Sequence, residues 1–125
     1  MDIAITVIQV LLTLGFAESG LLKLIIPYAK FAKLPGAAWV SDFKPEHIRL
    51  IGVLEVCAAV GLSVPLILHS LTMLTPLAAV GLTLVMAGAM ATHLRRGEYW
   101  HMVVNLIYLG LALFVAYGRL VGFAV

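Results

Sequence analysis

The sequence predicts an all-α protein, a bundle of four transmembrane helices in one domain covering residues 1–125. Hydrophobic residues make up 63% of the chain and charged residues 11%, whereas soluble domains average roughly 45–50% and 25%. Four apolar runs are long enough for a hydrocarbon core, which needs about 20 helical residues. The runs lack the alternating pattern of a membrane barrel, so helices must satisfy their backbone groups.

The first span is predicted over residues 3–26 and ends before Pro27, which cannot readily continue a helix. It starts without a positively charged region or a cleavage site, so we interpret it as a span rather than a cleaved signal. The second span is predicted over residues 49–68, the third over 71–92 and the fourth over 100–118.

The basic residues predict how the bundle is oriented. Seven of the eight fall between spans one and two or between spans three and four: Lys23, Lys30, Lys33, Lys44, Arg49, Arg95 and Arg96. Only Arg119 falls on the other side. By the positive-inside rule, both connections are cytoplasmic and both termini lie on the extracytoplasmic side of the cell (inner) membrane.

The long connection between spans one and two, residues 27–48, mixes lysines with aromatic and aliphatic residues such as Trp39 and Phe43. This mixture predicts an interfacial segment lying along the lipid headgroups. A docking surface for a partner protein is the alternative.

Cysteine and histidine usage gives no sign of a metal site. Cys57, the single cysteine, is predicted to be a small core residue. The four histidines show no i, i+4 pairing and no thiolate partners, so no metal is predicted. The histidines in question are His47, His69, His93 and His101.

Polar residues within the apolar runs predict a functional layer. Ionisable groups are expensive inside a membrane and normally face the bundle interior at a working site. Helical rise places Glu18, Glu55 and Asn105 at similar depths, roughly 9–12 Å from the cytoplasmic ends of their spans. We therefore expect a buried pocket with His93 and Lys23 at its mouth. The predicted ligand-binding residues are Glu18, Lys23, Glu55, His93, Asn105 and Tyr108; no catalytic residue is predicted.

Two carboxyl groups close together in a low dielectric cannot both ionise cheaply. Either Glu18 or Glu55 is therefore protonated, or Lys23 or His93 supplies a compensating charge. The structural alternative is that these polar groups only cross-link the helices through hydrogen bonds.

Three short motifs resemble the DoxX-like family of small four-helix membrane proteins. They are Glu18-Ser19-Gly20-Leu21-Leu22-Lys23-Leu24, Gly52-Val53-Leu54-Glu55 and Thr92-His93-Leu94-Arg95-Arg96-Gly97-Glu98. The resemblance implies likeness to the small membrane subunit of thiosulfate:quinone oxidoreductase systems and association with redox or detoxifying partners. More distant relatives act as membrane chaperones or assembly factors.

Together these observations predict a small membrane accessory subunit of a redox-linked system, not catalytic on its own, whose pocket binds a quinone-like or other amphipathic molecule. No covalently bound cofactor is predicted. Expected partners are the lipid bilayer, a membrane or cytoplasmic oxidoreductase and a second copy of the chain, but no nucleic acid. A non-catalytic scaffold or assembly factor is the alternative. A proton or solute channel is a third reading, disfavoured because the outer halves of the spans show no polar path.

Overall fold

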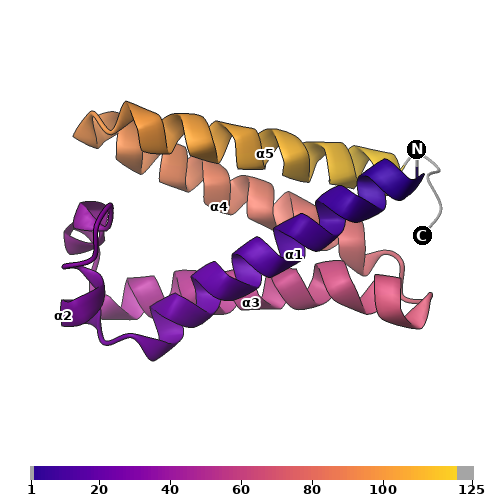
Figure 1. Cartoon of the computed structure of the whole chain (residues 1–125), viewed down its shortest axis with the longest axis horizontal. Helices are drawn as coiled ribbons and strands as arrows, with labels where there is room; N and C mark the ends of the chain where they lie inside the picture. Colours follow the sequence, from indigo (N-terminus) through magenta and orange to yellow (C-terminus); the bar gives the residue numbers. More distant parts are fainter. Residues whose placement is uncertain (1, 121–125) are drawn as a thin grey trace.

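The computed structural model describes residues 2–120, and within them it shows helices and no strand (Figure 1). The helices are α1 (Asp2–Ile25), α2 (Tyr28–Phe31), the 3-10 helix η1 (Ala38–Asp42), α3 (Pro45–Leu68), α4 (Leu74–Arg96) and α5 (Tyr99–Leu120). The four long helices are each long and apolar enough to cross a membrane. The predicted all-α bundle of four spans is therefore confirmed, although its helix boundaries need correction.

Local backbone chemistry explains where the boundaries differ. Helix α3 begins at Pro45 rather than near residue 49, because a proline in the first turn has a φ angle already suited to a helix. Helix α4 begins at Leu74 rather than at residue 71, since His69 and Leu71 both have left-handed φ angles, 54° and 55°. Two left-handed residues interrupt the helical path between α3 and α4.

The other end of α4 lies four residues beyond the predicted residue 92. Gly97, with a φ angle of 71°, donates its N–H to the Leu94 carbonyl at 3.2 Å, and Glu98 donates to the His93 carbonyl at 2.9 Å. This pair of bonds is the Schellman motif, which favours glycine at the left-handed position. As a result, His93 lies in the last turn of α4 and Glu98 follows directly in the turn to α5.

The bundle is built from two helix pairs, α1 with α3 and α4 with α5, while α1 and α5 touch little. The pairs lie close together where α1 begins and α5 ends, and they separate toward the opposite end (Figure 1). Helices α1 and α3 cross at two glycines: a Cβ added to Gly20 would lie 2.7 Å from the Gly52 carbonyl oxygen. Small residues allow such close helix contact in lipid.

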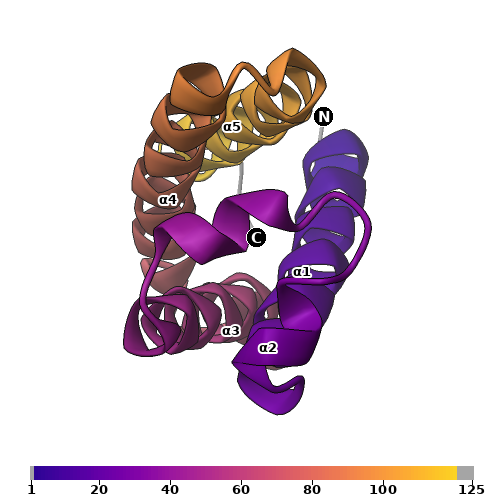
Figure 2. The ribbon, with the colours of Figure 1, turned by 90° about the vertical axis from the view of Figure 1, so that its left-hand side faces the viewer.

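A folded cap, residues 26–43, covers the separated helix ends, and η1 runs across the open end of the bundle (Figure 2). Phe31, Ala37 and Val40 are buried and pack in one cluster with Ile48 of α3. The Tyr28 hydroxyl lies 2.6 Å from the Phe43 carbonyl and donates to it. These apolar side chains turn inward and close the bundle, and the position of this segment at the lipid headgroups stays a prediction.

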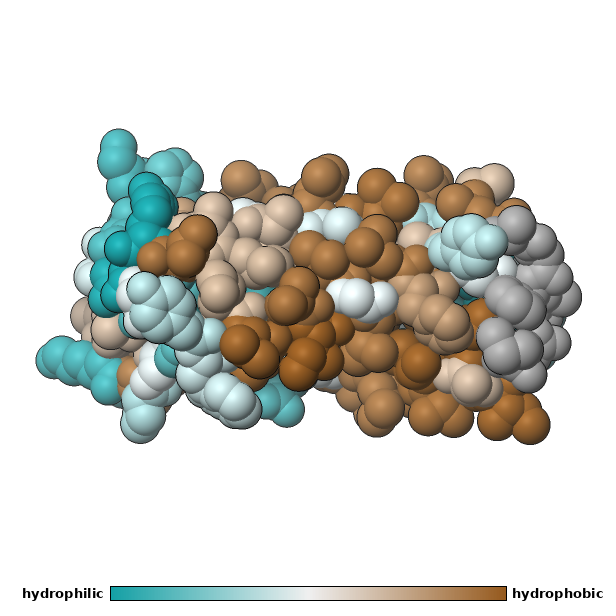
Figure 3. All heavy atoms as spheres, turned by 90° about the horizontal axis from the view of Figure 1, so that it is seen from above, coloured by the Kyte–Doolittle hydropathy of each residue, from teal (hydrophilic) through white to brown (hydrophobic). Residues whose placement is uncertain are grey.

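The outer surface of the long helices is apolar, and hydrophilic atoms gather at the cap end (Figure 3). Exposed apolar side chains include Leu14 on α1, Leu84 on α4 and Ile107 on α5. Such a surface suits lipid contact. Cys57 of α3 is also exposed, contrary to the predicted core position.

Candidate functional site

A buried ion pair joins the first two long helices. The Lys23 ammonium lies 2.8 Å from a carboxylate oxygen of Glu55, and both side chains are more than nine-tenths buried. Lys23 also donates to the Ser19 hydroxyl at 2.6 Å, and that hydroxyl lies 3.2 Å from each Glu55 oxygen. The close crossing at Gly20 and Gly52 brings these three side chains together. For Glu55, therefore, Lys23 supplies the compensating charge.

The cap completes the surroundings of Lys23. Its ammonium lies 6.0 Å from the ring centre of Phe31 and 5.9 Å from that of Trp39. Aromatic faces attract cations through the ring quadrupole. The cap therefore shields the ion pair from the open end of the bundle and adds to its stabilisation.

Glu18 differs from Glu55. It is exposed, and it makes no hydrogen bond or ion pair with any described residue. The predicted burial of Glu18 is corrected, because this side chain is exposed even though it contributes to the lining of a cavity between the helices. Seven residues separate it from Ile25, which places it about 10 Å within α1.

A cavity of about 890 Å³ lies between the two helix pairs beneath the cap. All six predicted ligand-binding residues line it: Glu18, Lys23, Glu55, His93, Asn105 and Tyr108. Whether they bind a ligand stays a prediction. Four aromatic residues also contribute to the wall: Phe16, Trp39, Phe43 and Trp100. Since Glu18 lines the cavity yet is exposed, the cavity reaches the molecular surface beside α1.

The inner end of the cavity is aromatic. Phe16 of α1 and Tyr108 of α5 meet edge to face, with ring centres 5.5 Å apart. A Cβ on Gly15 would lie 3.9 Å from the Tyr108 hydroxyl, so Gly15 leaves that hydroxyl uncrowded. Asn105 and Tyr108 are both half-buried, one turn apart on α5. This wall offers a hydroxyl and an amide beside an apolar surface.

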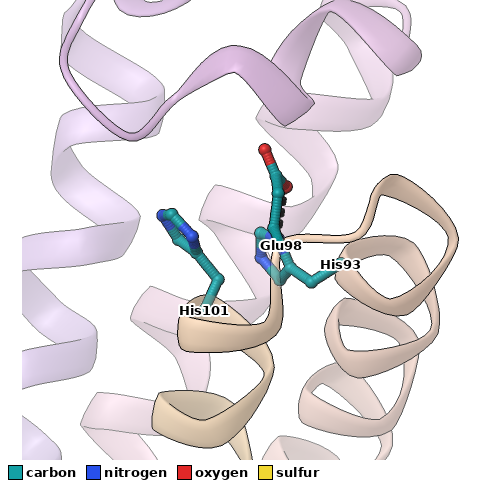
Figure 4. Close-up of side chains that lie close together, drawn as sticks. All are labelled: His93, Glu98 and His101. Atoms are coloured by element: carbon teal, nitrogen blue, oxygen red, sulfur yellow. Dashed lines mark hydrogen bonds and ion pairs between the residues drawn. The ribbon is translucent and has the colours of Figure 1, made fainter.

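A second polar group lies at the turn between α4 and α5 (Figure 4). His93 Nδ1 lies 2.8 Å from Glu98 Oε1, and the rings of His93 and His101 stack with their centres 4.8 Å apart. Arg96 Nε lies 3.3 Å from the same carboxylate oxygen. The hydrogen bond with His93 and then the Arg96 contact hold the pKa of Glu98 below its ordinary value. Glu98 is therefore ionised at neutral pH.

A third polar cluster, not predicted from the sequence, lies at the opposite end of the bundle. Gln9 of α1 is fully buried and donates to the Leu62 carbonyl at 2.6 Å and to the Thr75 hydroxyl at 3.2 Å. Arg119 donates to the side-chain amide oxygen of Gln9 at 3.0 Å and to the Thr6 hydroxyl at 3.1 Å. One amide therefore connects all four long helices. The position of Gln9 within an apolar run of the sequence was the signal that could have predicted this cluster.

An apolar cluster occupies the interior between this Gln9 cluster and the cavity. It contains Leu12, Phe16, Leu62, Leu82 and Met86, all buried. Within residues 3–120 no continuous polar path is therefore seen from one end of the bundle to the other. This arrangement disfavours a channel.

Four apolar helices around a cavity that is lined in part by polar side chains define a small multi-pass membrane protein. Residues 7–115 match the model of the DoxX-like family, and the chain belongs to that family. The resemblance drawn from the three motifs is thus confirmed. No curated protein and no solved structure matches the chain.

Proposed function

We propose that the protein is an accessory subunit of a redox-linked membrane system and that its cavity binds a quinone-like amphipathic molecule. The observation that carries this proposal is Glu18, an exposed carboxyl group about 10 Å within α1 that has no partner among the described residues. Within a membrane such a group is costly and normally faces a ligand pathway or a partner. By contrast, no buried side-chain polar atom of the described residues is left unsatisfied.

The cavity has the size and lining of a small-molecule site. Its volume, about 890 Å³, falls within the roughly 300–1,000 Å³ of ligand pockets. The aromatic walls suit a planar apolar ring. Asn105 and Tyr108 provide hydrogen-bond donors for a carbonyl oxygen, and the Glu18 carboxylate can accept a hydrogen bond from a hydroxyl group. A quinone and its hydroquinone present these groups.

Access from the bilayer follows from the packing. Helices α1 and α5 make few contacts, and the cavity between them is lined by Glu18 of α1 and Asn105 of α5. A lipid-soluble molecule would enter there without crossing the cap. Under the positive-inside interpretation this entrance faces the cytoplasmic leaflet of the inner membrane, with both termini on the extracytoplasmic side.

Quinone binding is tested with purified protein in lipid nanodiscs. Titration with a short-chain quinone should quench the fluorescence of Trp39 and Trp100, which both line the cavity. Glu18→Gln should weaken binding of the hydroquinone by about tenfold, the value of one charge-assisted hydrogen bond. Glu46→Gln, at an exposed position in the first turn of α3, is the matched control. Equal affinities for wild type and Glu18→Gln would contradict the proposal.

The alternative function is a non-catalytic scaffold or assembly factor that docks a partner through the cap. The observation in its favour is the exposed surface formed by Lys30, Lys33 and Leu34. If Lys30→Gln/Lys33→Gln breaks co-purification with a membrane or cytoplasmic oxidoreductase while Glu18→Gln has no effect, the scaffold function is supported instead.

A further inference from the structure

We propose that His93, Glu98 and His101 form a binding site for a divalent first-row transition metal, with Zn²⁺ or Fe²⁺ as the fitting ions. One donor atom from each residue can be chosen so that all three lie within 4.8 Å of one another. The close-up shows the three side chains converging where the α4–α5 turn passes beneath the cap (Figure 4). This inference does not depend on quinone binding.

The distances suit a metal after small rotations. Metal bonds to imidazole nitrogen and carboxylate oxygen are about 2.0–2.2 Å long, which sets donor atoms roughly 3.0–3.5 Å apart. The closest pair here, His93 Nδ1 and Glu98 Oε1, is separated by 2.8 Å, and the widest separation is 4.8 Å. The imidazole of His101 is half-buried on the first turn of α5 and stacks on His93 at an interplanar angle of 20°, so the two rings have to turn out of the stack before their in-plane lone pairs meet at one ion.

Donor capacity remains unused in this cluster. The ring nitrogens of His101 make no hydrogen bond with a described residue, and Glu98 Oε2 has no partner among them either. Gly36 of the cap leaves His101 room, since a Cβ there would lie 3.2 Å from His101 Nε2. The cluster therefore has free lone pairs at its centre rather than a closed hydrogen-bond network.

The surroundings hold two of the donors in place. The Schellman motif at Gly97 fixes the short path from His93 to Glu98, and Trp39 packs edge to face on His93 with ring centres 5.9 Å apart. Arg96, the competing cation at Glu98, has a second partner: its Nη1 lies 2.9 Å from Asp42 Oδ1. A metal that takes over Glu98 would thus leave Arg96 paired.

The donor set selects the class of ion. Two imidazoles and one carboxylate suit Zn²⁺ and Fe²⁺, whereas Mg²⁺ and Ca²⁺ prefer all-oxygen ligands. Three protein ligands also leave at least one coordination position open. Since His93 and His101 line the cavity, we expect this open position to face it.

The test uses Co²⁺ as a spectroscopic probe and protein from which any affinity tag has been removed. Wild-type protein in detergent should bind one Co²⁺ per chain with the strong visible bands of a four- or five-coordinate ion, and Zn²⁺ should displace it. His101→Gln and Glu98→Gln each remove a direct ligand and should each weaken binding by more than the roughly 100-fold that loss of a group supporting a ligand can cost. His47→Gln, an exposed histidine of α3, should leave the affinity unchanged. Absence of the bands, or equal losses in His47→Gln, would overturn the proposal.

A ligand exchange guards against loss of binding through misfolding. His101→Cys in a Cys57→Ala background places a thiolate in the cluster, and Co²⁺ should then give a sulfur-to-metal charge-transfer band in the near ultraviolet. The Cys57→Ala protein alone should lack this band. If His101→Cys binds Co²⁺ without the band, residue 101 is not a ligand and the proposal fails.

Discussion

The buried Lys23–Glu55 pair gives the sharpest prediction about stability. Removing one partner of a buried ion pair costs about 3–5 kcal/mol, because the other charge is left without compensation. In Glu55→Gln, Lys23 keeps its hydrogen bond to Ser19 and the faces of Phe31 and Trp39. Because these contacts still stabilise the Lys23 charge, we expect a loss near the lower end of that range, so that Glu55→Gln lowers the free energy of unfolding by about 3 kcal/mol.

The pairwise part of this energy comes from a double-mutant cycle with Lys23→Met. The double variant Lys23→Met/Glu55→Gln buries no charge at this position, so it should recover most of the loss seen in Glu55→Gln. Unfolding is measured by far-ultraviolet circular dichroism in mixed micelles with increasing dodecyl sulfate. A loss below about 1 kcal/mol in Glu55→Gln, or additive losses in the double variant, would refute the reasoning.

Three further predictions concern other contacts. Gly20→Ala should destabilise the protein by about 1–3 kcal/mol, since the new Cβ would lie 2.7 Å from the Gly52 carbonyl oxygen. Gly88 has open space around it, so Gly88→Ala should be neutral or stabilising in the same unfolding assay. Gln9→Leu should lower the free energy of unfolding by about 2 kcal/mol and broaden the unfolding transition. An unchanged midpoint would contradict the role of Gln9 in linking the four long helices. The third prediction concerns Glu98 in chelator-treated protein. The difference in the free energy of unfolding between wild type and Glu98→Gln should shrink as the pH falls from 4.5 through the lowered pKa of Glu98. The reason is that a carboxylate with a depressed pKa contributes stability only while it is ionised. A difference that is constant with pH would show that the ionised form adds nothing.

The number and type of the helices could be predicted from the sequence because a bilayer imposes both. Length and apolar composition identify a span without reference to its neighbours. The helix ends were less accurate, since they depend on single-residue geometry. Gly97 extends α4 to Arg96, and the left-handed His69 and Leu71 delay its start.

The site was predicted in part, for a related reason. Depth along a helix follows from residue counts, and this places Glu18, Glu55 and Asn105 along one cavity. The direction of a side chain depends on which helices pack together. Glu55 pairs with Lys23 of α1 and is buried, whereas Glu18 is exposed and has no partner among the described residues. The spacing of residues along the sequence does not predict this difference in burial between Glu55 and Glu18.

Tertiary structure also creates neighbours that sequence spacing hides. His93 and His101 are eight residues apart, which excludes the usual one-turn pairing on a single helix, yet the tight turn at Gly97 stacks their rings. The same holds for Gln9 and Arg119, at opposite ends of the chain. Their hydrogen bond depends on α1 and α5 meeting at one end of the bundle.

The gap between α1 and α5 has a consequence for how affinity should be expressed. A solute that arrives sideways is already dissolved in hydrocarbon, so its effective concentration is its mole fraction among the lipids rather than its concentration in water. Weak intrinsic contacts then suffice for high occupancy, because partitioning has concentrated the solute beforehand. Adding empty vesicles would therefore lower the occupancy of the cavity even when the total amounts of protein and solute stay the same, because the solute is then shared among more lipid.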